Sequence, residues 1–306
     1  MELIKPGSNI DFIGKVKGAI IFSLILIGIG LISLIIIGGP RYGIDFEGGT
    51  LVQIKFFNEV GTSEVRGALD KLAIEGLRVQ EFGEKGAQEY LISMKTTTGE
   101  LEGTSDTVKV ALQNAFGPES LEVRRVEMVG PKVGKDLRRK GVLAITFSLI
   151  GMLIYIWIRF ELRFGVGAII CLIHDVSITL GALSLANKPI DLPIIAALLT
   201  VVGYSVNDTI IISDRIRENL KKMSRGRLRD IINKSINQTL SRTTITAGTT
   251  LMVTIALFFL GGEVIHDFAF TLLVGICVGT YSSIFISSPL LIVWEKFFPK
   301  QRQRLL

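Results

Sequence analysis

The sequence predicts an α-helical polytopic membrane protein with six transmembrane helices in a one-plus-five layout and one inserted ferredoxin-like α+β domain outside the membrane. Three observations predict this class. The 306-residue chain is 48% hydrophobic, and its mean hydropathy of +0.49 is too high for an ordinary water-soluble protein of this size. Its apolar residues gather in stretches long enough to cross a bilayer. One long polar stretch separates the first of them from the rest.

The apolar stretches predict spans at 18–39, 141–158, 164–187, 192–213, 243–262 and 268–294. Residues 1–17 precede them, 214–242 form a basic connector, and 295–306 form a tail. The first stretch has about 21 apolar residues, more than the roughly 7–15 of a secretory signal core. Its exit, Gly38-Gly39-Pro40-Arg41, has no small-x-small cleavage pattern. We therefore expect an uncleaved spanning helix.

The polar insertion at 40–140, counted with its flanks, alternates strand and helix patterns. Strands are expected at 50–57, 78–82, 90–95 and 121–129, and helices at 63–76 and 105–116. The order βαββαβ predicts a ferredoxin-like sandwich. Because the insertion contains no histidine and no cysteine, we expect a binding or conformational module here rather than an active site.

Lysine and arginine residues predict the orientation. Threading six helices alternately places residues 1–17, 159–163, 214–242 and 295–306 on one side, and these segments hold most of the basic residues outside the inserted domain. By the positive-inside rule both termini are cytoplasmic. The exception is a basic cluster before the second span, Lys135, Arg138, Arg139 and Lys140. It adjoins a long external domain, and long translocated segments largely escape the rule.

Asp175 lies near the middle of the third predicted span, with Ser177 and Thr179 close by. A charged side chain at that depth costs about 3 kcal/mol or more, so such residues usually face a bundle interior or a water-filled cavity. An acid that alternates between its neutral and ionised forms can carry a proton. The other interpretation is a permanently protonated or hydrogen-bonded packing residue. His174 is expected to point about 100° away from Asp175 on the helix, in a neutral hydrogen-bonded role.

The fourth predicted span is unusually polar, with the sequence Gly203-Tyr-Ser-Val-Asn-Asp-Thr209 followed by Ser213-Asp-Arg215. Helical spacing places Tyr204, Asp208 and Arg215 on one stripe and Asn207 on its neighbour. We therefore expect Asp175, Asp208, Asn207 and Arg215 to line one proton path. Arg215 is interpreted either as a charge that gates release from an acid or as an interfacial anchor that reaches lipid phosphates.

The sequence implies neither a metal site nor another cofactor. The two cysteines, Cys171 and Cys277, and the two histidines, His174 and His266, form no spacing typical of zinc ligands. No Gly-x-x-x-x-Gly-Lys-Ser/Thr loop is present to bind nucleotide phosphates. The net charge of +6 is explained by the cytoplasmic basic residues and contact with anionic lipid, so we expect no nucleic-acid partner.

Three motifs in register with this topology resemble the SecF family, the six-helix subunits of the bacterial SecDF protein-translocation accessory complex. The first is Tyr42-Gly-Ile-Asp-Phe-Glu-Gly-Gly-Thr50, which contains Gly43, Asp45, Gly48 and Gly49. The second is His174-Asp175-Val176. The third is the segment 203–219, which begins with Gly203 and Tyr204. The likeness covers essentially the whole chain.

The resemblance implies a non-enzymatic subunit of the bacterial inner membrane, with a periplasmic domain and a distant relationship to resistance-nodulation-division transporters. It implies pairing with SecD, and use of the proton-motive force to promote preprotein export after SecA and SecYEG have begun it. SecYEG, YajC, translocating preproteins and membrane lipids are the other partners it suggests. Asp175 matches the family's intramembrane acid. Because SecD carries the large external domain of the pair, direct preprotein capture by residues 41–134 is not implied.

Two other functions are compatible with intramembrane acids. A proton-coupled exporter of small molecules would share the helix layout, but an external domain of this size leaves little room for a substrate pocket. An intramembrane aspartyl protease would need Tyr-Asp and Gly-x-Gly-Asp motifs, whereas the chain has His174-Asp175 and Val206-Asn207-Asp208. Neither the coupling ion, proton or sodium, nor the stoichiometry follows from the sequence.

Overall fold

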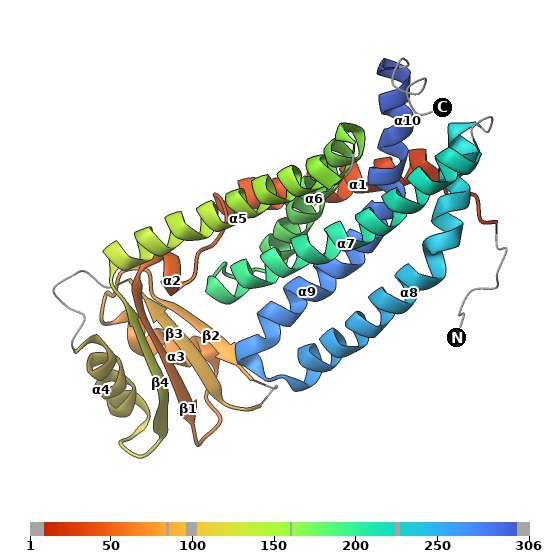
Figure 1. Ribbon diagram of the computed structural model, residues 1–306. Coiled ribbons are helices and arrows are strands. Elements are labelled where there is room, and N and C mark those ends of the chain that lie inside the picture. The colour runs from red at the N-terminus through yellow and green to blue at the C-terminus, as the bar shows by residue number, and fades with distance from the viewer. Residues whose placement is uncertain (1–8, 84–85, 96–102, 160, 224–226, 299–306) are drawn as a thin grey trace. The chain divides into compact units, whose positions relative to one another are not determined.

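The computed structural model describes residues 9–83, 86–95, 103–159, 161–223 and 227–298 (Figure 1). The chain divides into two compact units. The helical unit comprises Met1–Pro40, Ile145–Lys188 and Pro193–Leu306, and the sheet domain comprises Arg41–Ala144 and Pro189–Leu192. Within the described ranges, six helices are long and apolar enough to cross a membrane. The expected fold class is therefore confirmed.

The first span begins with η1 (Ile13–Lys15) and continues as α1 (Val16–Ile37). The others are α5 (Pro131–Arg159), α6 (Leu162–Leu185), α7 (Leu192–Lys222), α8 (Leu228–Leu260) and a continuous last span. That last span consists of α9 (Glu263–Ser282), the π-helical turn η2 (Ser283–Ser287) and α10 (Ser288–Phe297).

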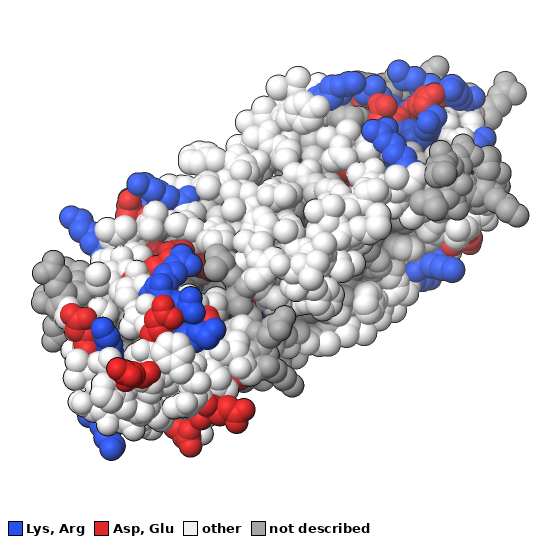
Figure 2. All heavy atoms as spheres, turned by 90° about the horizontal axis from the view of Figure 1, so that it is seen from below, with Lys and Arg blue, Asp and Glu red and all other residues white. Residues whose placement is uncertain are grey.

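Burial separates central from peripheral helices in the helical unit. In their apolar windows, α6, α7 and the last span are 56%, 50% and 50% buried, whereas α1, α5 and α8 are 11%, 11% and 17% buried. The peripheral helices instead expose large apolar side chains, such as Ile36, Ile158 and Leu260. Figure 2 shows a broad flank of the helical unit that is nearly free of charged side chains. Such a surface is what lipid tails cover.

Several helices extend beyond the predicted apolar stretches. α5 begins ten residues before the predicted span at 141, with Pro131 as its first residue, where a missing N–H costs nothing. α7 continues to Lys222 and α8 begins at Leu228, so these two helices contain most of the predicted connector 214–242. Lysine, arginine and glutamate are good helix formers, so the helices continue past the point where the apolar residues end. Arg242 consequently lies inside α8.

The sheet domain has the expected βαββαβ order. After the short helix α2 (Ile44–Glu47), it contains β1 (Gly49–Phe56), α3 (Thr62–Asp70), β2 (Arg78–Phe82), β3 (Glu89–Met94), α4 (Thr104–Phe116) and β4 (Leu121–Val129). The strands pair antiparallel in the order β2-β3-β1-β4 (Figure 1). Alternate residues of β1 and β3 are buried, which places Val52, Ile54 and Ile92 in the core.

One predicted helix of the domain is shorter than expected. The pattern at 63–76 predicted a continuous helix, but α3 ends at Asp70 and Ala73 adopts a left-handed conformation. Leu72 and Ile74 pack on the domain core after the turn. A straight helix places residues two apart on different faces, so the turn is what allows both side chains to pack, partly buried, against the core.

Candidate functional site

Asp175 is fully buried in α6, at 0% exposure, and both of its carboxyl oxygens have polar partners. Nδ1 of His174 lies 2.8 Å from Oδ1. The Ser205 hydroxyl, from α7, donates to Oδ2 over 2.5 Å. Sγ of Cys171, one helical turn earlier on α6, lies 3.9 Å from Oδ2. The carboxyl group is thus held between two helices by groups that can give or accept a proton.

His174 connects this acid to α1. Its Nε2 lies 2.9 Å from Oγ of Ser23, and this oxygen lies 3.1 Å from the hydroxyl of Tyr281 on α9. The Tyr281 hydroxyl donates over 2.6 Å to the carbonyl of Ala19, and its ring stacks on the His174 ring. His174 and Asp175 were predicted to point about 100° apart on the helix. In the structure the His174 imidazole instead contacts the Asp175 carboxyl group.

A second layer of hydroxyl groups lies beside Asp175. Cys171 donates to the Ser282 hydroxyl over 3.0 Å, and the hydroxyls of Thr209 and Ser283 lie 2.9 Å apart. Ser283 begins the π-helical turn η2. Single π turns inside α-helices are frequent at functional sites because they break the regular side-chain register.

Asp208 of α7 is equally buried, at 0% exposure, but it has weaker partners. The Thr280 hydroxyl lies 3.5 Å from Oδ2, and Oδ1 has no hydrogen-bond partner among the residues that the structure describes. An unpartnered buried carboxyl oxygen is costly, so this position is suited to a proton or another small ligand.

The remaining predicted residues of α7, which are two path residues and two family-motif residues, have other surroundings than the two acids. Arg215 pairs with Glu218 over 2.9 Å and is partly exposed. Asn207 and Gly203 are exposed on α7, and Tyr204 packs against a small apolar cluster between α7 and α9. Arg215 therefore pairs with a neighbouring acid of its own helix rather than with Asp175 or Asp208.

Residues 280–283, the last three of α9 and the first of η2, contact Asp208 and the groups around Asp175. Thr280 reaches Asp208, while the next three residues reach Ser23, Cys171 and Thr209 in that order. These four residues were not among the predicted site residues. Their signal was Thr280-Tyr-Ser-Ser283, a run of four hydroxyl side chains in an otherwise apolar stretch. The same criterion that selected Asp175, polar residues where polarity is costly, would have found them.

The motif residues before β1 have structural roles within the sheet domain. The Gly43 N–H donates to the Ile190 carbonyl, and Oδ2 of Asp45 accepts the N–H of Leu192 at the start of α7. Gly48 and Gly49 have φ values of +77° and +141°, and a Cβ at Gly49 would lie 2.2 Å from the Met94 carbonyl oxygen. Only glycine fits this passage. Asp45 satisfies an orphan N–H of the helix start.

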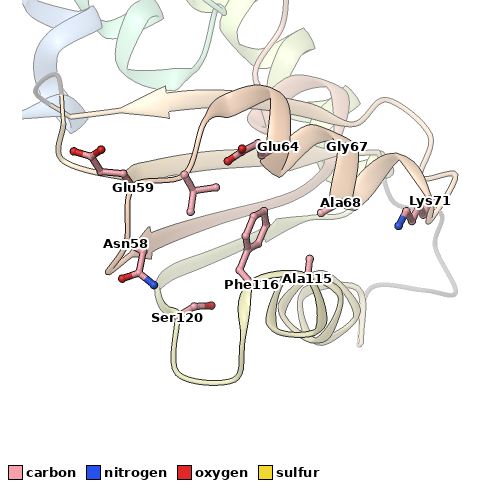
Figure 3. Close-up of a pocket in the computed structure, with 10 residues that line it drawn as sticks. Asn58, Glu59, Glu64, Gly67, Ala68, Lys71, Ala115, Phe116 and Ser120 are labelled. Carbon is pink, nitrogen blue, oxygen red and sulfur yellow. The ribbon is translucent and has the colours of Figure 1, made fainter.

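A separate cavity of about 530 Å³ lies in the sheet domain between α3 and α4 (Figure 3). Its lining combines the ring of Phe116 with small side chains and the charged residues Glu59, Glu64 and Lys71. Glu64 also accepts the Gly61 N–H as a helix cap. None of the predicted path residues lines this cavity.

Comparison with known proteins agrees with this architecture. The family model for protein export membrane protein SecD/SecF, C-terminal, matches residues 107–297, and the SecD/SecF GG motif matches residues 33–56. Protein translocase subunit SecF of Calditerrivibrio nitroreducens is 48% identical over 293 residues, covering 95% of each chain. SecF of Magnetococcus marinus is 48% identical over 298 residues, covering 96% of this chain and 95% of the relative.

Two solved structures share the fold. SecDF from Thermus thermophilus, a translocon-associated membrane protein, has a TM-score of 0.85 and 37% identity. A SecDF structure in a super-membrane-facing form has a TM-score of 0.69 and 35% identity. They cover 97% and 100% of this chain, but the chain spans only 40% and 41% of theirs. By sequence match over nearly its full length and by fold, the chain belongs to the SecF family of protein translocase subunits, multi-pass membrane proteins of protein transport.

Proposed function

We propose that this chain pairs with SecD and uses the proton-motive force to promote preprotein export across the bacterial cytoplasmic membrane, after SecA and SecYEG have begun translocation. The observation that carries the proposal is Asp175: a fully buried acid inside a spanning helix, contacted by an imidazole, a hydroxyl and a thiol. Each of these groups can exchange or relay a proton, and structural packing alone would not require all three.

Proton movement supplies energy in suitable amounts. One charge moving through 100 mV yields about 2.3 kcal/mol, and one pH unit adds about 1.4 kcal/mol. This is enough to shift a two-state equilibrium by more than a hundredfold per ion, in order of magnitude. Repeated cycles can therefore bias the sheet domain between two orientations. Strain stored in this way helps draw a preprotein outward.

The path runs from the outer side to Asp175 and then toward the cytoplasm past Asp208. Asp208 takes the proton on the oxygen that has no hydrogen-bond partner in the described part of the chain. Arg215 lies about two helical turns beyond Asp208 on α7, at the end where the basic residues gather, and anchors the helix end or gates the exit. Asn207 lies on the exposed face of α7. It contributes to the path by contacting a helix of the partner protein, not a helix of this chain.

The partner is SecD. Ala196, Thr200, Gly203 and Asn207 are all exposed on α7 at spacings of four, three and four residues, which makes one stripe along the helix. Small residues allow helices to approach closely, and an amide exposed to lipid needs a hydrogen-bond partner. The similar SecDF chains, more than twice as long as this one, supply the analogy for a second half.

Placement in the membrane follows from the basic residues. Both termini and the α7–α8 turn face the cytoplasm, and the sheet domain faces the periplasm. SecYEG and YajC are the further partners we expect, with anionic lipid around the cytoplasmic helix ends.

The decisive experiment measures proton flux and preprotein export in vesicles that contain this chain, SecD and the translocation channel. Asp175→Asn keeps the shape of the side chain but removes its ability to release a proton. We expect both flux and gradient-dependent export to fall to the level of vesicles without this chain. Asp214→Asn, at an exposed position of the same residue type, is the matched control and should leave both unchanged. Wild-type flux and export in an assembled Asp175→Asn complex would contradict the proposal.

A further inference from the structure

Four polar contacts in series join Asp175 to α1. They run from Asp175 Oδ1 to His174 Nδ1 at 2.8 Å and from His174 Nε2 to Ser23 Oγ at 2.9 Å. From there they continue to the Tyr281 hydroxyl at 3.1 Å and to the Ala19 carbonyl at 2.6 Å. Both ends of the series, a carboxyl oxygen and a carbonyl oxygen, can be hydrogen-bond acceptors. A hydrogen bond needs one proton in each contact, so the protons can be counted.

With one extra proton on the Asp175–His174 pair, every contact is satisfied. The series then holds four protons: one on the imidazole, one on Ser23, one on Tyr281 and the extra one. The Asp175–His174 proton lies in the first contact, His174 Nε2–H donates to Ser23, Ser23 donates to Tyr281, and Tyr281 donates to Ala19. The count is the same whether the extra proton sits on the carboxyl group or on the imidazole.

Without that proton, three protons remain for four contacts. The first contact keeps its proton, because a hydrogen bond to an ionised carboxylate is about twice as strong as one between neutral groups. The missing proton therefore falls in one of the other three contacts. Each of these three includes an atom of α1, either Ser23 Oγ or the Ala19 carbonyl. Whichever contact lacks it, α1 loses one hydrogen bond to the helices beside it.

We propose that Asp175 and His174 form a single proton-binding pair that reports its protonation state to α1 through Ser23, so that proton release loosens α1 from α6 and α9. The inference rests on the proposed function and names the coupling step within it. α1 ends at Ile37, and its cap Gly38 leads through Gly39 and Pro40 to Arg41, where the sheet domain begins. A change in how tightly α1 binds α6 and α9 is therefore transmitted to the sheet domain through the covalent chain.

Two other titratable side chains contact the pair in the described part of the chain. They are Cys171 of α6, 3.9 Å from Asp175, and Tyr281 of α9, whose ring stacks on that of His174. α7 contributes the hydroxyl of Ser205 and α1 that of Ser23. Ser205 donates its own proton to the second carboxyl oxygen and so does not enter the count.

Ser23→Ala tests the inference, because it interrupts the series at α1 while Asp175 and His174 stay in place. In the vesicles described above, we expect proton flux to continue at the wild-type rate while the gradient-dependent stimulation of export falls at least about fivefold. One lost hydrogen bond is worth about 1 kcal/mol, which corresponds to a factor of about five. Ser33→Ala is the matched control. It removes another hydroxyl contact between α1 and α6, to Ser184 at 2.8 Å, outside the series.

Two further variants keep the test decisive. Ser23→Thr restores the hydroxyl and should restore stimulation. Tyr281→Phe interrupts the same series from α9. It serves in place of Ser23→Ala if that protein fails to assemble with SecD, and the expected result is the same. When the missing proton falls in either of the two contacts of Tyr281, an infrared difference spectrum of ring-labelled tyrosine between high and low pH also contains a Tyr281 band, assigned by its absence in Tyr281→Phe. The band should vanish in Asp175→Asn.

The outcomes separate this inference from the proposed function. If Asp175→Asn abolishes flux and export but Ser23→Ala behaves like Ser33→Ala, the pair does not act through α1 and the inference is wrong. If Asp175→Asn changes neither flux nor export, the proposed function is wrong, whatever Ser23→Ala does.

Discussion

The interiors of the two units differ in the polar side chains that they hold beside their apolar clusters. The helical unit buries two acids, a histidine and many hydroxyl groups, Ser205, Thr209, Thr239, Thr271, Ser282 and Ser283 among them. The core of the sheet domain is apolar, with Val52, Ile54, Phe56, Val65, Leu69, Ile92 and Leu112 as fully or almost fully buried members. Its one large polar member is Tyr90, whose hydroxyl donates to the Val60 carbonyl.

This difference follows from the two solvents. In water, burial of apolar surface stabilises a fold. In lipid the surroundings are as apolar as leucine, so helices associate through close packing and interhelical hydrogen bonds instead. The helical unit can therefore hold titratable groups in its interior, whereas the sheet domain is stabilised mainly by its apolar core. Identical substitutions should act differently in the two units.

The two acids show a second contrast inside the helical unit. Asp175 has partners on both oxygens, whereas Asp208 has one long contact and an oxygen without a partner in the described part of the chain. Under the proposed function, Asp175 is the acid pre-organised for one proton, and Asp208 is the less stabilised acid that a proton enters and leaves readily.

The largest expected effect on stability is in the domain core. Phe56 is 1% exposed and packs edge-on against Tyr90 and Phe116. Phe56→Ala should lower the free energy of unfolding of the sheet domain by about 3–5 kcal/mol. Its neighbour Phe57 is 61% exposed, so Phe57→Ala should cost little. Hydrogen exchange of amides in β1 and β3 of the full chain measures both. Equal effects would show that the apolar core does not stabilise this unit.

A smaller loss is expected where α1 meets α6. A Cβ on Gly30 would lie 2.8 Å from the Gly181 Cα, so the two backbones are in direct contact. Gly30→Ala should destabilise the helical unit by about 1–3 kcal/mol because the helices must move apart. Gly28 has nothing within 4 Å of the added carbon and provides the control. Thermal unfolding in detergent compares the two. A neutral Gly30→Ala would indicate that close packing does not hold these helices together.

Asp175→Asn and Asp208→Asn should differ in their effect on stability. The first weakens contacts to His174 and Ser205 and should cost about 1 kcal/mol. The second removes a potential charge that is poorly paired and should cost nothing or stabilise slightly. Thermal unfolding near neutral pH tests this. If Asp208→Asn proves the more destabilising, then Asp208 has partners that its contacts do not account for.

The smallest effect concerns Tyr90 and alkaline pH. Burial, followed by the charge of Glu81, raises the pKa of Tyr90 above its ordinary value of 10.0. The folded state then holds the phenol proton more tightly than the unfolded chain, so its contribution to stability is complete below about pH 10 and is lost as pH rises through the folded pKa. Pulse proteolysis in urea across this range should show a steeper decline for wild type than for Tyr90→Phe. Parallel curves would mean that the phenol is not shielded from water.

Much of the fold was predictable because its signals are local. Six apolar stretches predicted the spans, and period-two alternation predicted β1, β3 and β4 nearly to their ends. The helix ends beyond the lipid were not predictable from hydropathy, because helix propensity continues where apolar character stops. For the same reason Arg242 was assigned to a connector although α8 contains it.

The sequence by itself determined the fold class, the family motifs and the two acids, because a carboxyl group in a membrane span is costly and therefore conspicuous. Only the tertiary structure decided what each acid contacts. Ser23, Ser205 and Tyr281 come from three different helices, and single hydroxyl groups in apolar stretches give no signal of their own. Helices packed by small residues and hydrogen bonds can adopt several registers, and which hydroxyl faces which acid depends on the one that packs best.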